Sequence, residues 1–403
     1  MPDAPDEASG LARLRFRVSM WFERVPALAV GIVLIGLAAA AYWLPGSDRF
    51  YNHFVWQADA FLHGRAMIDW PVQATATNPG NSFFQDVYPV LGADGQPIGA
   101  LLPFPPLPGL VLVPFVALWG LATDERAVSV AFGAIDVGLA WWALGQLRVS
   151  RSIRLATTLF FAVGTVFFYA AQEGTTWFFA HVVAVGCALL AVGVALGGDP
   201  GADDAVEAAP TAGDLLAPIG LAIRRPFGVI DRRQLVAGLL FGLACTGRLT
   251  VVFGAPFFLF VGSGGSWVRR AISAGIGTAI PVSLLLAYNL ASSGQLFQPG
   301  YDYQYRAEAS GYPTLNYHPD WSIEDIRYLP QNLGILFLQA PAILPDALPT
   351  TLMTPGDPAC QAPDAQRGLF DRDCPIAEPE AIGMSILLTS PAYLFVLSAL
   401  WRA

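Results

Sequence analysis

The chain has 403 residues, of which 54% are hydrophobic and 13% are charged, and its mean hydropathy is +0.50. Soluble domains carry about twice that fraction of charged residues, so the composition excludes an ordinary water-soluble protein. The net charge of −9, in a chain whose 22 basic residues are all arginine, argues against nucleic acid as a partner. We expect an all-α polytopic membrane protein, a helical bundle with large loops.

Apolar runs long enough to cross a bilayer predict about eight transmembrane helices. The first, at 26–44, follows an arginine-bearing stretch and is too long for the core of a signal peptide, so we expect a retained anchor. The other spans are expected at 128–147, 153–171, 175–197, 235–263 as a pair of short helices, 270–291 and 383–401. The last span ends at Arg402, which leaves open whether the chain is complete at residue 403 or truncated.

Arginines set the expected orientation, because loops on the cytoplasmic side carry an excess of basic residues. With the N-terminus inside, the cytoplasmic segments hold Arg13, Arg15, Arg17, Arg24, Arg148, Arg151, Arg154, Arg224, Arg225, Arg232, Arg233, Arg269 and Arg270. This arrangement requires that the apolar, proline-rich segment 101–121 does not cross the membrane. Each proline lacks a backbone N–H donor and leaves a carbonyl unsatisfied, which is costly in lipid. We therefore expect this segment to stay at the outer interface, with a helix that starts after the prolines.

This orientation divides the chain into a tail, a membrane core and two outer loops. We expect a cytoplasmic tail at 1–25, a core at 26–300, a second extracytoplasmic loop at 301–382 and a terminal helix at 383–403. Within the core, 46–127 is the first extracytoplasmic loop and 198–234 is a cytoplasmic linker. Cys360 and Cys374 share the second outer loop, where an oxidising compartment would allow a disulfide between them.

The first outer loop opens with a segment, 47–65, that predicts an amphipathic interfacial helix capped by Asp48 and ended by Gly64. Asp59 lies on this helix among large apolar side chains, so it is either a solvated side chain or a functional carboxylate. A continuous helix places Asp48 and Asp59 about 16 Å apart, too far to act on one atom. His53 and His63 share the segment, and we expect both on the surface.

Four polar residues near or within the spans have two interpretations each. Arg248 interrupts the helix pair at the outer turn, where it either snorkels to water or binds an anion. Glu173 is either an ordinary residue of an outer hairpin or part of a site, and His181 is either a buried, hydrogen-bonded histidine or a site residue. Asp136, in the middle of a span, is a functional candidate or a protonated carboxyl between helices.

An anchor helix, an outer loop that opens with an Asp-bearing helix, and then the element Pro105-Pro106-Leu107 follow one another before a series of helices. This order resembles the GT-C superfamily of membrane glycosyltransferases over roughly 26–300, in architecture more than in identity. The branch it resembles most contains protein O-mannosyltransferases and lipid A aminoarabinose transferases, and WQADAFLHGR and LPFPPLPGLVLVPF are similar to actinobacterial and chloroflexal members. Two departures are Phe104, where the branch has a basic residue, and Arg49 after Asp48, where it has a second acid.

The resemblance implies an enzyme of the bacterial inner membrane, with its active site outside. It would transfer a hexosyl or pentosyl unit from a polyprenyl-phosphate carrier to a glycan, lipid or protein acceptor, with inversion. Asp59, or alternatively Asp48, would be the catalytic base, and Arg248 would hold the donor phosphate. The residues that would contact donor or acceptor are Pro105, Pro106, Leu107, Glu173, His181 and Tyr301. No cofactor is implied with certainty, and a divalent cation stays open.

Two rival functions remain at the level of sequence. A transporter or flippase of lipid-linked sugars predicts paired broken helices near the midplane and symmetry between two halves. A non-catalytic, truncated paralogue is kept open by the missing acidic neighbour of Asp48 and by the early end of the chain. Nucleotide-dependent and soluble-hydrolase chemistry has no support, because the chain contains no P-loop, HExxH or GxSxG motif.

Overall fold

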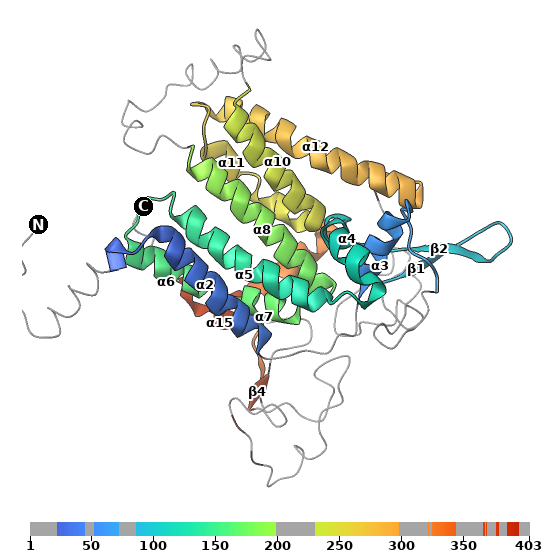
Figure 1. The fold of residues 1–403 in the computed structure, drawn as a ribbon, viewed down its shortest axis with the longest axis horizontal. Coiled ribbons are helices and arrows are strands. Elements are labelled where there is room, and N and C mark those ends of the chain that lie inside the picture. The colour runs from blue at the N-terminus through green and yellow to red at the C-terminus, as the bar shows by residue number, and fades with distance from the viewer. Residues whose placement is uncertain are drawn as a thin grey trace, which may run out of the picture. The chain divides into compact units, whose positions relative to one another are not determined.

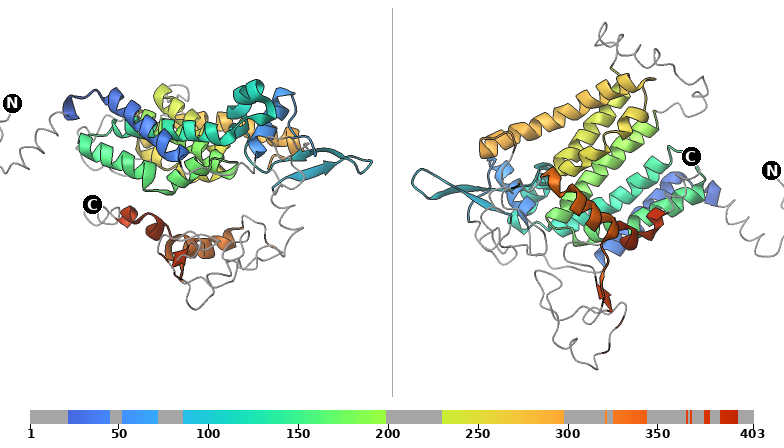
Figure 2. Two further views of the ribbon diagram at one scale, coloured as in Figure 1. Left: turned by 60° about the horizontal axis from the view of Figure 1, so that its bottom comes forward. Right: turned by 180° about the vertical axis from the view of Figure 1, so that it is seen from behind.

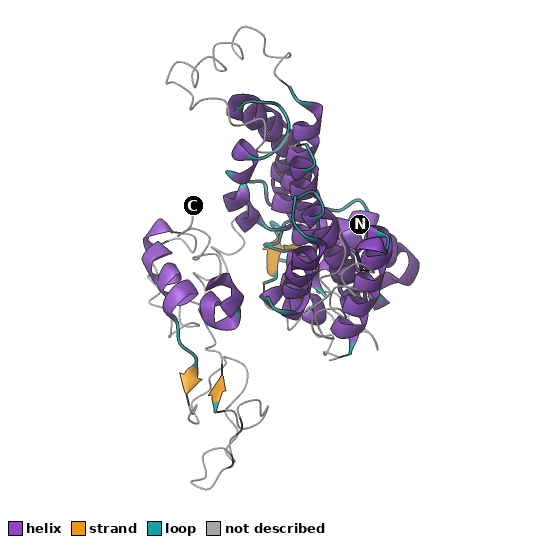
Figure 3. Cartoon of the chain, turned by 90° about the vertical axis from the view of Figure 1, so that its left-hand side faces the viewer, coloured by secondary structure: helices purple, strands orange, loops and turns teal. Residues whose placement is uncertain are grey.

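The structure is a computed structural model whose described residues are 22–44, 52–71, 86–198, 230–297, 321, 325–343, 366, 368, 376–378 and 385–394. Its contacts divide the chain into two units, Met1–Gly300 and Tyr301–Ala403. Four residues with expected roles, Asp48, Tyr301, Cys360 and Cys374, lie outside the described residues. In the described parts helices dominate, and the strands form two short antiparallel pairs (Figure 3).

Five helices of the first unit lie side by side in a row (Figures 1 and 2). In spatial order they are α2 (Ala27–Trp43), α5 (Glu125–Leu144), α8 (Trp177–Leu196), α10 (Arg232–Gly247) and α12 (Trp267–Ser293). The backbones of α10 and α12 approach closely because small residues line their contact, and a side chain at Gly238 or Gly277 would collide with the facing helix.

Three helices, α5, α8 and α12, are long and apolar enough to cross a membrane. A fourth candidate span consists of α6 (Arg151–Val163) and α7 (Val166–Glu173), which meet at a bend of 52°. A helix of 20 residues, the length of α5 and α8, is about 30 Å long and matches the hydrocarbon core of a bilayer. The expected all-α membrane protein is therefore confirmed in outline. The described residues contain three or four candidate spans, and the count of about eight stays a prediction.

The span expected at 153–171 is not one straight helix. Its first half ends at Gly164, whose N–H donates to the Phe160 carbonyl. Thr165 then adopts an extended backbone, and its hydroxyl accepts a hydrogen bond from the N–H of Phe167, which starts α7. The bend follows from a helix stop and a new N-cap at neighbouring positions.

The expected pair of short helices at 235–263 is present. Asp231 caps the first helix, α10, which ends at Gly247. The chain then runs back through the 3-10 helix η4 (Leu249–Gly254) and α11 (Phe257–Phe260). The carboxamide of Gln234, near the start of α10, donates to the Phe258 carbonyl at 2.8 Å, so the end of the returning segment lies beside the start of α10.

The segment 46–127 is expected to be extracytoplasmic and is called the first outer loop below. Its described part contains two helices and a hairpin. These are α3 (His53–Leu62), β1 (Tyr88–Leu91), β2 (Pro97–Leu101) and α4 (Leu107–Trp119). The strands pair antiparallel with Val90 opposite Gly99, and the hairpin projects away from the helices (Figure 1). Helices α3 and α4 pack against each other.

Two expectations for this loop need correction. Helix α3 begins at His53, after Asn52, so it is shorter than the helix expected from Asp48. Its expected end is confirmed, because Gly64 follows the last turn with a φ of +68°. Helix α4 is 13 residues long, about 20 Å and too short to span a bilayer, but it encloses Pro108 and Pro114 instead of starting after them.

In the second unit, the described helices are short: η5 (Ile326–Tyr328), α14 (Leu329–Leu338), α15 (Ile386–Thr389) and η7 (Pro391–Tyr393). Two-residue strands, β3 (Ala342–Ile343) and β4 (Ala377–Glu378), pair antiparallel. The continuous helix expected from 383 is wrong for the described residues 385–394, where α15 ends before Pro391. The Ser385 hydroxyl donates to the Phe337 carbonyl at 2.8 Å and joins α15 to α14.

Candidate functional site

The two ends of the helix row in the first unit differ in charge. At one end, which we call the arginine end, lie Arg24, Arg148, Arg151, Arg154, Arg232, Arg233, Arg269 and Arg270. Several of them donate to backbone carbonyls there, as Arg151 does to Phe22 and Arg233 does to Val194. At the other end, which we call the loop end, the first outer loop packs against the helices through contacts of His53 and Gln57.

Helix α3 is buried at the loop end rather than lying with one solvated face. His53, Phe54, Val55, Trp56, Gln57 and Ala58 are each at most 1% exposed. The surface position expected for His53 is therefore wrong, whereas His63 is exposed as expected. The imidazole Nδ1 of His53 lies 2.9 Å from the hydroxyl of Thr176, and the rings of Trp56, Phe104 and Trp177 surround it.

Thr176 connects His53 to a buried carboxyl group that the sequence did not single out. Thr176 precedes α8 with φ +36° and ψ −99°, and its N–H donates to Oε1 of Glu125 at 2.6 Å. Glu125 is 1% exposed, and its Oε2 has no hydrogen-bond partner among the described residues. A hydrogen-bonded chain of Glu125, Thr176 and His53 thus joins α5, α8 and α3.

Arg248 lies at the loop end, directly after α10. Its guanidinium donates to the carbonyl of Trp177 at 2.7 Å, and the indole of Trp177 donates to the carboxylate of Asp86 at 2.8 Å. Asp86 is 7% exposed and has a φ of +62°. Arg248 is half-buried, so a cation stands where α10 breaks, as expected. Trp177 contacts both this cation, through its carbonyl, and Asp86, a carboxylate that the sequence did not single out, through its indole.

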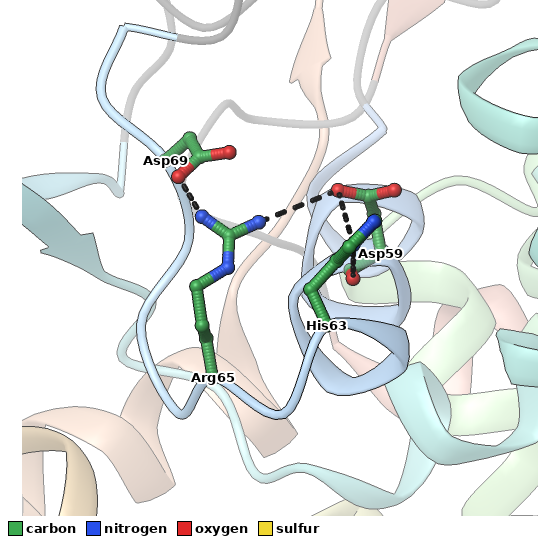
Figure 4. A network of polar contacts seen from close by, with 4 residues as sticks. All are labelled: Asp59, His63, Arg65 and Asp69. Atoms are coloured by element: carbon green, nitrogen blue, oxygen red, sulfur yellow. Dashed lines mark hydrogen bonds and ion pairs between the residues drawn. The ribbon is translucent and has the colours of Figure 1, made fainter.

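Asp59 belongs to a separate, more exposed network (Figure 4). Its carboxylate lies 3.7 Å from the guanidinium of Arg65 and 3.6 Å from Nδ1 of His63, and its side chain is 26% exposed. Arg65 also pairs with Asp69, so it stands between two carboxylates. Asp59 is accessible to a ligand from water and stays outside the buried chain of His53.

The Pro-Pro-Leu element lies against the buried face of α3. Phe104, which precedes it, is 2% exposed, and its ring lies 5.6 Å from those of His53 and Phe54. A basic side chain buried at that position would need a partner, so the apolar side chain of Phe104 fits this position. Pro106 is buried, whereas Pro105 and Leu107 are half-buried, so the element forms an apolar wall.

Helix α4 also approaches α3 closely. The side chain of Gln57 lies directly over Gly109, where any Cβ would collide with it. The Gln57 carboxamide nitrogen donates to the hydroxyl of Tyr288 on α12 at 3.0 Å, while its Oε1 is buried with no partner among the described residues. The packing of α4 on α3 agrees with the expectation that 101–121 belongs with the rest of this loop. Gln57 and Tyr288, in contrast, give no local signal of their contact.

Three other candidates were expected from the sequence. Glu173 is half-buried at the end of α7, before Gly174, as in an ordinary helix end. His181 is exposed on α8, so the buried histidine expected there is wrong, but it lies close enough to Arg248 for their charges to interact. Asp136 is 2% exposed against Gly186, and it lies on α5 eleven residues, or about 17 Å, from Glu125. Asp136 is therefore an intramembrane carboxyl outside the loop-end cluster.

No metal-binding group is present among the described residues, where no three His, Cys, Asp or Glu side chains lie close enough together. The divalent cation left open by the resemblance has no assigned ligands in that part of the chain. Comparison of the chain with protein-family models, curated proteins and solved structures finds no match. The case for a function therefore rests on the residues themselves.

Proposed function

We propose that the chain is a polytopic membrane glycosyltransferase that moves a sugar from a polyprenyl-phosphate carrier to an extracytoplasmic acceptor. The observation that carries this proposal is the burial of the first outer loop against the helix ends beside Arg248. His53 and Phe104 of that loop surround Trp177, and the Trp177 carbonyl accepts a hydrogen bond from Arg248. A loop that is packed in this way forms part of a site and does more than connect two helices.

The charge difference between the two ends supports an extracytoplasmic site. Eight described arginines gather at the arginine end, and the positive-inside rule places such an end in the cytoplasm. The loop end then faces the outside, with Asp59, Asp69, Asp86 and Glu125 among its carboxylates. An acceptor that is built outside the bacterial inner membrane would approach the site from this side.

Arg248 is the group best placed to bind the donor phosphate. It follows α10 at the break, and the next segment, η4, exposes Leu249, Val252 and Phe253 in the manner of a lipid-facing surface. A polyprenyl phosphate moves within the bilayer, so its head group can meet a cation at a helix break near the surface.

Asp59 is proposed as the base, with Asp48 as the alternative outside the described residues. In the proposed step the acceptor hydroxyl oxygen forms a bond to the anomeric carbon, and the bond from that carbon to the phosphate oxygen breaks. The hydroxyl proton passes to the carboxylate, and the lipid phosphate leaves as an anion that a fixed cation stabilises. The partial exposure of Asp59 is compatible with access by the acceptor.

A screen of radiolabelled polyprenyl-phosphate sugars tests this function. Membranes with and without the protein are incubated with each donor, and polyprenyl phosphate and labelled product are separated by chromatography. We expect protein-dependent release of polyprenyl phosphate together with transfer of label for at least one sugar. A protein that moves intact donors between leaflets without cleaving them would instead be a flippase of lipid-linked sugars.

A further inference from the structure

The hydrogen-bonded chain of Glu125, Thr176 and His53 joins three elements that are distant in sequence. Glu125 begins α5, Thr176 precedes α8, and His53 begins α3. All three residues are at most 1% exposed, and the two hydrogen bonds measure 2.6 and 2.9 Å. In addition to contacts between aromatic rings, these hydrogen bonds link the first outer loop directly to the start of α8.

The backbone of Thr176 is held in a conformation that threonine avoids. A φ of +36° with a ψ of −99° lies outside the allowed regions for a β-branched residue, at a cost of about 1–3 kcal/mol. Such a conformation persists when its surroundings fix it. One contact that holds it is the carboxyl oxygen of Glu125, which accepts the Thr176 N–H. In this conformation the hydroxyl of Thr176 reaches His53.

We propose that Glu125 is a positioning residue of the transferase site, an inference that rests on the proposed function. Glu125 fixes the strained backbone of Thr176, and Thr176 fixes His53 and with it helix α3, which carries Asp59. A buried carboxyl with one oxygen on an amide and one without a described partner is costly for stability alone. Its presence is explained if the site requires α3 to be held in one position.

Four variants separate this role from a merely structural one. Glu125→Ala removes the acceptor, whereas Glu125→Gln keeps a carbonyl oxygen for the Thr176 N–H. Thr176→Gly adopts a positive φ without strain but loses the hydroxyl, whereas Thr176→Ser keeps the hydroxyl. The matched control is Asp124→Ala, which removes the neighbouring carboxylate that caps α5 through the N–H of Ala127.

Two readouts are measured on the full-length protein in proteoliposomes. In donor kinetics, Glu125→Ala and Thr176→Gly are expected to lower kcat about tenfold or more with little change in KM, because a buried hydrogen bond is lost. Glu125→Gln and Thr176→Ser are expected to recover most of the activity. In hydrogen exchange, the amides of α3 are expected to exchange faster in Glu125→Ala than in the wild type. Their exchange rates are expected to be unchanged in Asp124→Ala.

The outcomes distinguish failure of this inference from failure of the proposed function. Unchanged exchange in α3 of Glu125→Ala, or equal loss of kcat in Glu125→Ala and Asp124→Ala, would overturn the positioning role. A wild-type protein without transferase activity would refute the proposed function, and the exchange of α3 would still decide whether Glu125 positions His53. Thr176→Gly that is folded and fully active would also contradict the inference.

Discussion

His53 and Thr176 form a buried hydrogen bond of 2.9 Å across 123 residues of sequence. This contact places the first outer loop against the N-terminus of α8, next to the Trp177 carbonyl that Arg248 contacts. The loop is thereby part of the same folded unit as the membrane helices. The predictions below depend on this arrangement.

Replacing His53 should destabilise the protein, whereas replacing His63 should not. His53→Ala leaves the Thr176 hydroxyl without its partner and opens a cavity among aromatic rings, at a cost of about 2–4 kcal/mol. His63→Ala removes an exposed side chain and is expected to change stability by less than about 0.5 kcal/mol. Unfolding in detergent measures both, and equal effects would show that His53 is not buried as described.

Asp59→Asn should abolish sugar transfer while the protein stays folded. A general base typically contributes about 10²–10⁴-fold to a rate, so turnover should fall by at least two orders of magnitude. Asp69→Asn is the matched control, because Asp69 contacts the same Arg65 but has no proposed role in proton transfer. Full activity in both Asp59→Asn and Asp48→Asn would exclude the proposed bases.

Arg248→Gln should weaken use of the donor. Loss of a charge-assisted contact to phosphate is expected to raise the donor KM roughly tenfold to hundredfold. Arg248→Lys retains the charge but not the planar fork, and it should recover part of the loss. Donor titrations in proteoliposomes check the ranking, and unchanged kinetics in Arg248→Gln would mean that this arginine only reaches toward water.

The cap of α10 at the arginine end predicts a sensitivity to acid. Burial raises the pKa of Asp231, but the Ser263 hydroxyl, the Gln234 N–H and the charge of Arg269 outweigh it, and the net pKa is lowered. An aspartate with a lowered pKa in the folded state stabilises the protein above its unfolded pKa of about 3.9, and this stability is lost as the pH falls through the folded value.

The same cap allows a test by substitution. Asp231→Asn keeps an acceptor for the N-terminal amide but loses the charge, so the unfolding free energy should depend less on pH below about 4. The measurement is the unfolding free energy of both proteins from neutral pH downward. If the unfolding free energy of the wild type and of the variant changed equally with pH, the lowered pKa of Asp231 would be contradicted.

The proposed orientation predicts which positions a membrane-impermeant thiol reagent can label. In a background without the native cysteines, Asp94→Cys at the tip of the hairpin should react in intact cells. Val149→Cys lies at the arginine end, after α5, and should react only after the membrane is made permeable. The reverse pattern would place the loop end in the cytoplasm.

Hydropathy predicted the helices well where an apolar run alone determines a helix. The boundaries of α2, α8 and α12 lie within three residues of the expected spans, and the break at Arg248 was expected because a charge interrupts an apolar run. The bend between α6 and α7 was missed, because Gly164 and Thr165 are common inside membrane helices and give no strong stop signal.

The candidate site could be predicted only in part. The Pro-Pro-Leu element and the first outer loop were expected together, and they do meet at Phe104 and α3. The burial of His53 could not be expected, because it depends on Thr176 and Trp177 more than a hundred residues away. Glu125 was not singled out, since nothing local in the sequence shows that its carboxyl accepts the N–H of a distant threonine.

The measurement that tests the central claim most directly is cleavage of a polyprenyl-phosphate sugar by the purified protein in proteoliposomes. The wild type is compared with Asp59→Asn and Arg248→Gln, using the donor identified by the screen. We predict that the wild type releases polyprenyl phosphate and a glycosylated acceptor with an inverted anomeric carbon, and that both variants lose most of this activity. Donors that remain intact with the wild type, or that only cross the bilayer, would contradict a glycosyltransferase.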